Sequence, residues 1–203
     1  LEEHIAIWRK LWTGEPVTHH GEDLDLVDHT IGPLPWRTEG PPVLITAADN
    51  VLLTHDAIAT MVQQTLATRA DAAAAFARKD DILAVHPEGQ RRFYNFADDG
   101  YSNCNLYWIG SPAALKAAEI FRSGGQFAKN PMRIASAFGL INLLRFRFGF
   151  GTLTDAFSRI TKRLGIAIVP VVMTDGALAI DVDNERTHRV VSDILDRRGT
   201  MKR

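Results

Sequence analysis

One stretch decides the fold of this 203-residue chain: Val43-Leu-Ile-Thr-Ala-Ala-Asp-Asn-Val-Leu-Leu-Thr54. It opens with an apolar run whose length and turn boundary predict a buried strand over residues 43–47. Asp49 is its one carboxylate, and Thr54 can cap a helix predicted over residues 55–68. In open α/β sheets, ligands bind just beyond the carboxyl ends of the strands. Asp49 therefore lies where a metal or nucleotide site is expected, although a turn aspartate that caps the next segment is the plainer explanation.

Strands and helices alternate beyond this stretch, which predicts an α/β fold with a largely parallel sheet. The further expected strands are 71–77, 92–96, 106–109, 166–169 and 177–180, and the further expected helices are 80–84, one beginning at Pro112, 131–148, 154–164 and 185–196. Before the first strand, residues 2–12 predict an amphipathic helix with Ile5, Trp8, Leu11 and Trp12 on one stripe. Residues 17–42 are rich in Gly and Pro and predict a loop, with a weak strand near 23–27.

Composition excludes several classes of protein. The formal net charge is -1, so no overall positive charge favours nucleic acid as a partner. Cys104 is the single cysteine, which rules out an internal disulfide and fits a cytoplasmic, reducing setting. No apolar run approaches the roughly 20 residues that span a bilayer. The acidic first residues do not look like a signal peptide.

A second acidic segment, Ala179-Ile-Asp-Val-Asp-Asn184, follows another apolar run. If it is extended, Asp181 and Asp183 point to opposite sides, so one of them faces the site. Asp183 is nearer the end of the expected strand and is preferred, although it also suits the start of the last helix. Two strand-end acidic sites far apart in sequence can converge on one divalent cation.

Three other polar features have plain structural explanations. Asn105 could bind a substrate hydroxyl or simply form a turn, and the two readings are even. Cys104 has no basic partner in sequence, which argues against a nucleophile. His19 and His20 diverge if extended, so an exposed loop is favoured over a metal site.

Residues 121–163 hold eight basic residues against one acid. This suits phosphate recognition or a solvated helix face. Arg145-Phe-Arg-Phe-Gly-Phe150 also permits contact with a membrane surface, which is the weaker interpretation because six residues bury little area.

Residues 41–198 resemble the MobA-like nucleotidyltransferases, the family of molybdenum-cofactor guanylyltransferase-like enzymes. The resemblance rests on the opening stretch, Cys104-Asn-Leu-Tyr107, Lys129-Asn-Pro-Met-Arg-Ile-Ala135 and the 179–184 segment, in the same order and spacing. It implies a Rossmann-like sheet of the GT-A type, mostly parallel and flanked by helices. It also implies transfer of a nucleoside monophosphate from an NTP to a small-molecule acceptor, with Mg²⁺ held by Asp49 and Asp183. Asn105 would lie in the acceptor pocket, and Lys129 and Arg133 would meet phosphates.

The family's glycine-rich loop, which grips the triphosphate, has no counterpart before residue 41, so the expected fold is N-terminally incomplete. Residues 2–45 instead resemble a segment of the luciferase-like flavin-dependent monooxygenases, from Glu2-Glu-His-Ile-Ala-Ile-Trp8 through Gly40-Pro-Pro-Val-Leu-Ile45. We therefore expect a segment of different origin over 1–40 and a nucleotidyltransferase-like domain over 41–203. An uncovered sheet edge or apolar face is expected, which a homodimer could cover.

Three hypotheses follow. The first is a nucleotidyltransferase-like protein that binds NTP with Mg²⁺, either as a working enzyme or, without the loop, as an inactive one. The second is a fragment of a flavin-dependent monooxygenase. The third is a non-catalytic binding protein that uses the basic segment.

Overall fold

The computed structural model describes residues 2–22, 24–31, 43–111, 113–114 and 150–200. The chain divides into two compact units, Leu1–Val43 and Leu44–Arg203. The helix expected over 131–148 lies outside the described residues, as do Lys129 and Arg133.

The first unit contains helix α1 (Glu2–Leu11) and two antiparallel strands, β1 (Val17–His20) and β2 (Asp25–His29). Ile7, Leu11 and Val17 form its buried cluster, and Leu24, Leu26 and Ile31 pack against it. The expected stripe on α1 is wrong in part, because Trp8 is 47% exposed and Ile7 is buried instead. The expected loop is wrong over β1, because apolar residues of the hairpin pack with those of α1. The weak strand expected near 23–27 overlaps β2.

The histidine pair also differs from expectation. His19 and His20 end β1 rather than lying in a loop. Nε2 of His19 lies 2.7 Å from Oε1 of Glu3 on α1, and His20 contacts Asp25 on β2. These contacts join β1 to α1 and to β2 and use both rings.

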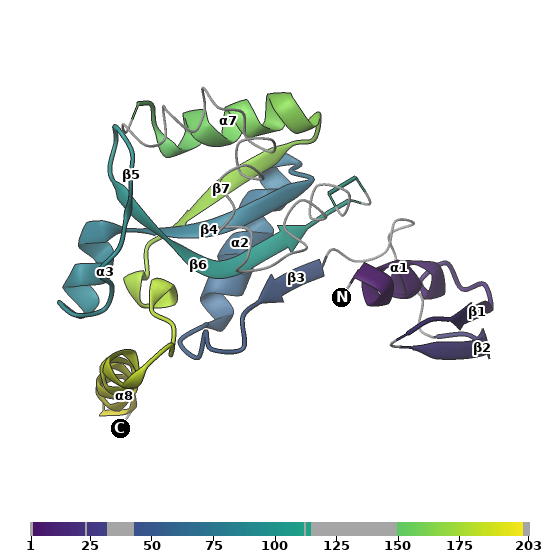
Figure 1. Ribbon diagram of the computed structural model, residues 1–203, viewed down its shortest axis with the longest axis horizontal. Helices are drawn as coiled ribbons and strands as arrows, with labels where there is room; N and C mark the ends of the chain where they lie inside the picture. The colour runs from purple at the N-terminus through teal and green to yellow at the C-terminus, as the bar shows by residue number, and fades with distance from the viewer. Residues whose placement is uncertain (1, 23, 32–42, 112, 115–149, 201–203) are drawn as a thin grey trace. The chain divides into compact units, whose positions relative to one another are not determined.

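The second unit is built on a mixed sheet with strand order β3-β6-β4-β7 and β5 paired to β6 (Figure 1). The strands are β3 (Val43–Thr46), β4 (Ala72–Arg78), β5 (Tyr94–Asn95), β6 (Gly100–Ile109) and β7 (Ile168–Met173). β4 runs parallel to β7 and antiparallel to β6. The Rossmann-like α/β class is confirmed, and the expected mostly parallel sheet is a mixed one because β6 is reversed.

The alanine-rich strand β4 lies at the centre of this sheet. Ala73, Ala75 and Ala77 are buried on the face that also packs Met61 of helix α2 (His55–Thr68). The opposite face of β4 presents Phe76, which packs with Leu153 of helix α7 (Leu153–Leu164). Burial on both sides, with ladder hydrogen bonds on both edges, overrides the helical preference of alanine.

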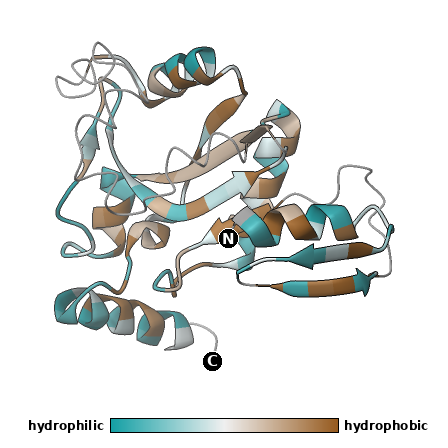
Figure 2. Cartoon of the chain, turned by 45° about the vertical axis from the view of Figure 1, so that its right-hand side comes forward, coloured by the Kyte–Doolittle hydropathy of each residue, from teal (hydrophilic) through white to brown (hydrophobic). Residues whose placement is uncertain are grey.

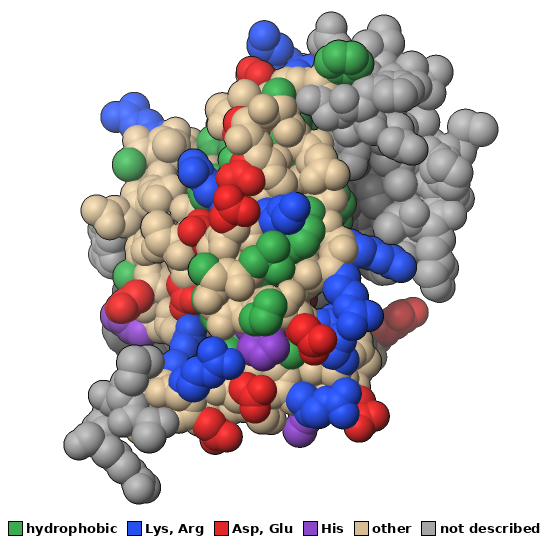
Figure 3. Space-filling model, turned by 90° about the vertical axis from the view of Figure 1, so that its left-hand side faces the viewer, with side chains coloured by type: hydrophobic (Ala, Val, Ile, Leu, Met, Phe, Trp, Pro, Cys, Tyr) green, Lys and Arg blue, Asp and Glu red, His purple; other side chains and the backbone are tan. Residues whose placement is uncertain are grey.

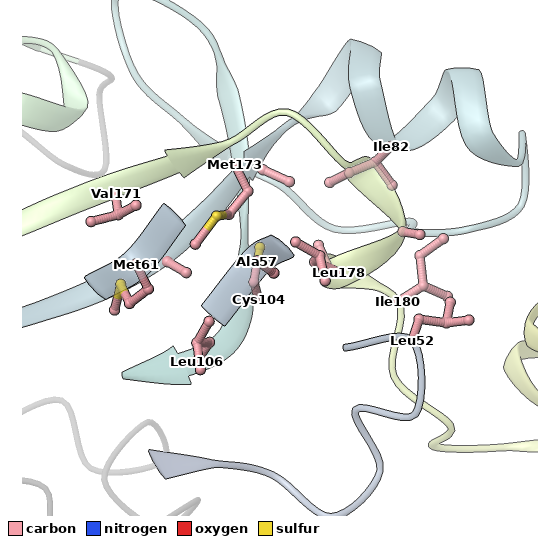
Figure 4. Close-up of a cluster of buried hydrophobic side chains, with 14 of the residues drawn as sticks. Leu52, Ala57, Met61, Ile82, Cys104, Leu106, Val171, Met173, Leu178 and Ile180 are labelled. Carbon is pink, nitrogen blue, oxygen red and sulfur yellow. The ribbon is translucent and has the colours of Figure 1, made fainter. Parts of the chain in front are cut away.

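The main core lies between the sheet, α2 and the C-terminal segments (Figure 4). Met61 and Ile82 are 0% exposed, and burying such side chains contributes about 1.5–3 kcal/mol each. Helix α3 (Lys79–Val85) supplies Ile82, and helix α8 (Glu185–Thr200) supplies Ile194. Helices α7 and α8 carry both hydrophilic and hydrophobic residues, as expected of amphipathic helices (Figure 2).

Local sequence sets where the helices begin and end. The Thr54 side chain accepts from the amide of Ala57, as expected from the sequence. Thr152 and Asp155 form a reciprocal capping box at the start of α7, and Gly165 ends that helix in the left-handed conformation. Beyond β6, the Ser111 hydroxyl accepts from the amide of Ala114, as an N-cap serine does.

The strand expected over 177–180 is wrong. Gly176–Ala179 forms a 3-10 helix, η3, whose four residues are buried. The Asp175 side chain accepts from the amide of Ala177 and so starts the turn. A Cβ at Gly176 would lie 2.3 Å from the Asp81 carbonyl oxygen, so only glycine fits against α3 here. A short apolar run does not distinguish a strand from a buried helical turn.

The outer face of the second unit carries charges of both signs. Figure 3 shows acidic and basic side chains interspersed around small apolar patches on the side where α3 and α8 lie. The pairs on α8 include Arg189 with Glu185 at 3.3 Å and Arg198 with Asp175 at 2.7 Å. Within the described residues, each helix is too short or too polar to cross a membrane.

Candidate functional site

Asp49 lies in the turn that follows β3, and its neighbour Asn50 fixes that turn. Asn50 is 5% exposed. Its side-chain amide donates to the Cys104 carbonyl oxygen at 2.8 Å and to the Thr46 hydroxyl at 3.2 Å. The Ala47 amide adds a bond of 3.3 Å to the Asn105 carbonyl oxygen. The turn that carries Asp49 is therefore tied to the middle of β6.

The second acidic segment, residues 179–184, lies beside the turn that carries Asp49, although it is near the C-terminal end of the domain. After η3, the chain runs without regular structure through residues 180–183 and enters α8. The amide of Val182 donates to the Asp49 carbonyl oxygen at 3.2 Å. This bond joins two segments that lie far apart in the sequence, and it places both acidic segments side by side.

Asp181 is the carboxylate of this segment that faces β6. The side-chain amide of Asn105 donates to Oδ2 of Asp181 at 2.7 Å. Asp183 is exposed, and its backbone amide donates to the Thr187 hydroxyl at the start of α8. The structure thus brings Asp49, Asn105 and Asp181 together, with Asp183 at the outer side. The sequence-based preference for Asp183 overlooked this contact of Asp181.

Asp181 is electrostatically unfavourable as a carboxylate. Its pKa is raised to about 6, mainly by burial and to a smaller extent by the charges of Asp49 and Asp183, while the hydrogen bond from Asn105 acts in the opposite direction. Desolvation and like charges both disfavour the ionised form. A cation placed among these side chains would reverse both effects.

Two carboxylate oxygens in this cluster are buried without a donor. Oδ1 of Asp49 and Oδ1 of Asp181 have no hydrogen-bond partner among the described residues. Buried acceptors of this kind are uncommon in proteins and call for a ligand, a water or an ion. Their chemistry, two anionic oxygens with no donor, suits a hard cation.

The protein ligands for such a cation would be few. In the described part of the chain, no group of three or more His, Cys, Asp or Glu side chains is arranged to hold a metal. Mg²⁺ commonly binds through one or two carboxylates and completes its shell with water and substrate phosphates. The pair Asp49 and Asp181 fits that pattern better than it fits a closed structural metal site.

Cys104 lies beside the cluster but takes no part in its chemistry. Its side chain is fully buried, and burial, with smaller effects from Asp181 and Asp175, raises the pKa of the thiol. A thiolate is therefore disfavoured, in agreement with the expectation that Cys104 is no nucleophile.

Two residues of this site escaped the sequence analysis. Asn50 follows Asp49 in an otherwise apolar stretch, and Tyr107, whose hydroxyl lies 3.3 Å from Oδ1 of Asn105, lies within another; a polar side chain in an apolar stretch is the signal that could have marked both. Asn105 was expected at a junction between a loop and a strand, yet it lies inside β6 with φ 48°. The expected phosphate contacts, Lys129 and Arg133, lie outside the described residues.

Comparisons with known proteins inform the fold. No family model matches the chain. No curated protein matches it either. A solved structure from Thermus thermophilus, described as a hypothetical transferase, is similar with a TM-score of 0.63. The two share 22% sequence identity, and the match covers 92% of this chain and 84% of that one. The likeness supports the Rossmann-like α/β fold.

Proposed function

We propose that this chain is a nucleotidyltransferase-like protein that binds an NTP with Mg²⁺ and transfers a nucleoside monophosphate to a small-molecule acceptor. One observation carries the proposal: Asp49 and Asp181 each bury an oxygen that has no donor among the residues that the structure describes, in segments that a backbone hydrogen bond joins. The sequence resemblance to the MobA-like family and the fold shared with a hypothetical transferase support it.

The position of the cluster in the sheet agrees with this function. Asp49 follows β3, and Asp181 follows β7 by way of η3, so both come after the carboxyl ends of strands. Ligands of open α/β sheets bind at that edge. A triphosphate that brings its own oxygens would complete the cation's shell, which agrees with the small number of protein ligands in the described part of the chain.

In this proposal the chain's residues mainly position the metal ion, and the ion neutralises charge on the phosphates. Asp49 and Asp181 would hold Mg²⁺, and Asp183 would add its negative charge from the outer side of the segment that carries Asp181. Asn50 would keep Asp49 in place through its bonds to β6. When bound, the ion supplies positive charge that offsets the charge developing on the transferred phosphoryl group.

Isothermal titration calorimetry tests the proposal directly. Each NTP is titrated into the wild-type chain with and without Mg²⁺, and the same titration is repeated on Asp49→Ala. We expect heat that needs Mg²⁺ and is lost in the variant. The matched control is Asp56→Ala, since Asp56 is an exposed aspartate in the first turn of α2. Equal heats for Asp49→Ala and wild type would rule out this site.

A further inference from the structure

Beside Asp181, strand β6 carries three polar side chains that contact one another. The Tyr107 hydroxyl lies 3.1 Å from Oδ1 of Asn103 and 3.3 Å from Oδ1 of Asn105. The backbone amide of Asn105 also donates to Oδ1 of Asn103. The chain of contacts therefore runs from Tyr107 through Asn105 to Asp181.

The backbone of β6 is irregular at the residue that contacts Asp181. Asn105 has φ 48°, in the left-handed region that asparagine tolerates better than most residues. The pairing of β4 with β6 shifts register between Ala74 and Phe76, which face Tyr107 and Asn103. An irregularity of this kind changes the direction of a side chain on a strand. Here it accompanies the contact of Asn105 with a segment 76 residues away.

The two ends of the Asn105 amide differ chemically, and each end meets the partner that suits it. The nitrogen donates to the Asp181 carboxylate, and the oxygen accepts from the Tyr107 hydroxyl. In the reversed orientation the amide oxygen would face a carboxylate and the NH₂ group would face a hydroxyl. A carboxylate has no donor to offer, so the contact with Asp181 favours one orientation. The Tyr107 hydroxyl is compatible with that orientation, because its one proton lies within reach of Oδ1 of Asn103 at 3.1 Å and of Asn105 at 3.3 Å.

We propose that Asn105 and Tyr107 are positioning residues that hold the Asp181 carboxylate in one orientation, with Oδ2 on the amide and Oδ1 left for a cation. The inference rests on the proposed function for the cation, whereas the orientation itself is a property of the protein alone. It also gives Asn105 a role through Asp181 in addition to the acceptor-pocket role that the resemblance implies.

Mn²⁺ binding, followed by electron paramagnetic resonance, tests the role of both residues. Asn105→Gly removes the donor while keeping a residue that accepts positive φ, and we expect it to weaken Mn²⁺ binding about 10-fold to 100-fold. Tyr107→Phe removes one neutral hydrogen bond and should weaken binding about threefold to tenfold.

The matched control is Tyr101→Phe on the same strand. Its hydroxyl donates to Asp98 at 2.9 Å, away from the cluster. We expect unchanged Mn²⁺ affinity in this control. Wild-type affinity in both Asn105→Gly and Tyr107→Phe would overturn the inference, and so would an equal loss in Tyr101→Phe.

A second readout needs no cation. In ¹⁵N-labelled protein, the side-chain amide of Asn105, assigned by its loss in Asn105→Gly, should exchange slowly with solvent and exchange faster in Tyr107→Phe. If wild type fails to bind Mn²⁺ but shows this coupling, the proposed function fails and the positioning role stands. If wild type binds Mn²⁺ but Tyr107→Phe leaves the amide unchanged, the positioning role fails and the proposed function stands.

Discussion

Asn105 donates its side-chain amide to Asp181 at 2.7 Å, although 76 residues separate them. The contact joins a central strand to the segment before the last helix. It also leaves the second oxygen of Asp181 buried and without a donor among the described residues. A carboxylate held on one side and unsatisfied on the other is costly for folding, and such a cost is typical of functional sites.

The free energy of unfolding should depend on pH through Asp181. Its pKa rises from 3.8 to about 6 in the folded chain. The folded state therefore binds more protons than the unfolded state between about pH 4 and pH 6. Stability is higher below this window and falls as pH rises through it. We expect Asp181→Asn to raise the free energy of unfolding at pH 7.5 by about 1–2 kcal/mol, allowing for solvent screening.

Urea unfolding at pH 4.5 and pH 7.5 measures this effect. The variant should gain stability over wild type mainly at the higher pH, where wild-type Asp181 is ionised. Addition of Mg²⁺ at pH 7.5 should stabilise wild type and leave Asp181→Asn nearly unchanged. A variant that is less stable than wild type at pH 7.5 would contradict this interpretation of Asp181.

Gly176 should be intolerant of a side chain. A Cβ there would lie 2.3 Å from the Asp81 carbonyl oxygen and 2.5 Å from the Ile82 amide nitrogen. Because these atoms belong to backbone, they cannot rotate away, and we expect Gly176→Ala to cost about 1–3 kcal/mol in chemical unfolding.

Gly199→Ala is its matched control. Gly199 lies in α8, and a Cβ there would meet nothing within 4 Å among the described residues. Alanine in a helix should then stabilise by up to about 1 kcal/mol. If Gly176→Ala and Gly199→Ala shift the unfolding midpoint equally, close packing between η3 and α3 does not cause the loss of stability in Gly176→Ala.

The thiol of Cys104 should be unreactive in the folded chain. Cys104 is 0% exposed, and burial raises the pKa of its thiol. We expect Ellman's reagent at pH 8 to modify it only as fast as the chain unfolds, and to modify it at once in guanidinium chloride. Rapid reaction of the native chain would show that the core between β6 and η3 opens to solvent.

Arg198 of α8 should stabilise the turn after Asp49 through its contact with Leu52. Its guanidinium donates to the Asp175 carboxylate at 2.7 Å and to the Leu52 carbonyl oxygen at 3.4 Å. We expect Arg198→Gln to lower the free energy of unfolding because both contacts are lost. The loss should be only about 1 kcal/mol, because the pair is partly exposed. Arg189→Gln, which loses only a surface pair within α8, serves as the comparison and should change stability by less than about 0.5 kcal/mol. Thermal or urea unfolding of both variants distinguishes the two cases.

Much of the fold was predictable because local signals and burial agree. The strand at residues 43–46, the helix from His55 and the helix from Leu153 all carry clear apolar runs or capping residues. The strand expected over 71–77 forms against alanine's helical preference, and the structure gives the reason: β4 lies between β6 and β7 and is buried.

The site was less predictable, since its geometry depends on contacts across the chain. The run at 177–180 could be a strand or a helical turn, and packing of Gly176 against α3 decided for the turn. The sequence pattern favours Asp183 because of its place near the end of the expected strand, whereas the contact with Asn105 places Asp181 against β6. The left-handed backbone of Asn105 inside a strand has no local sequence signature beyond the tolerance of asparagine for that conformation.

Calorimetry of Mg²⁺-dependent NTP binding to wild type, Asp181→Asn and Asp49→Asn at pH 7.5 tests whether Asp49 and Asp181 hold Mg²⁺ for an NTP. We expect measurable binding in wild type, loss of binding in both variants, and an Asp181→Asn variant that is folded and at least as stable as wild type. Binding that persists in both variants, or wild-type binding that is the same without Mg²⁺, would contradict this role of the two carboxylates.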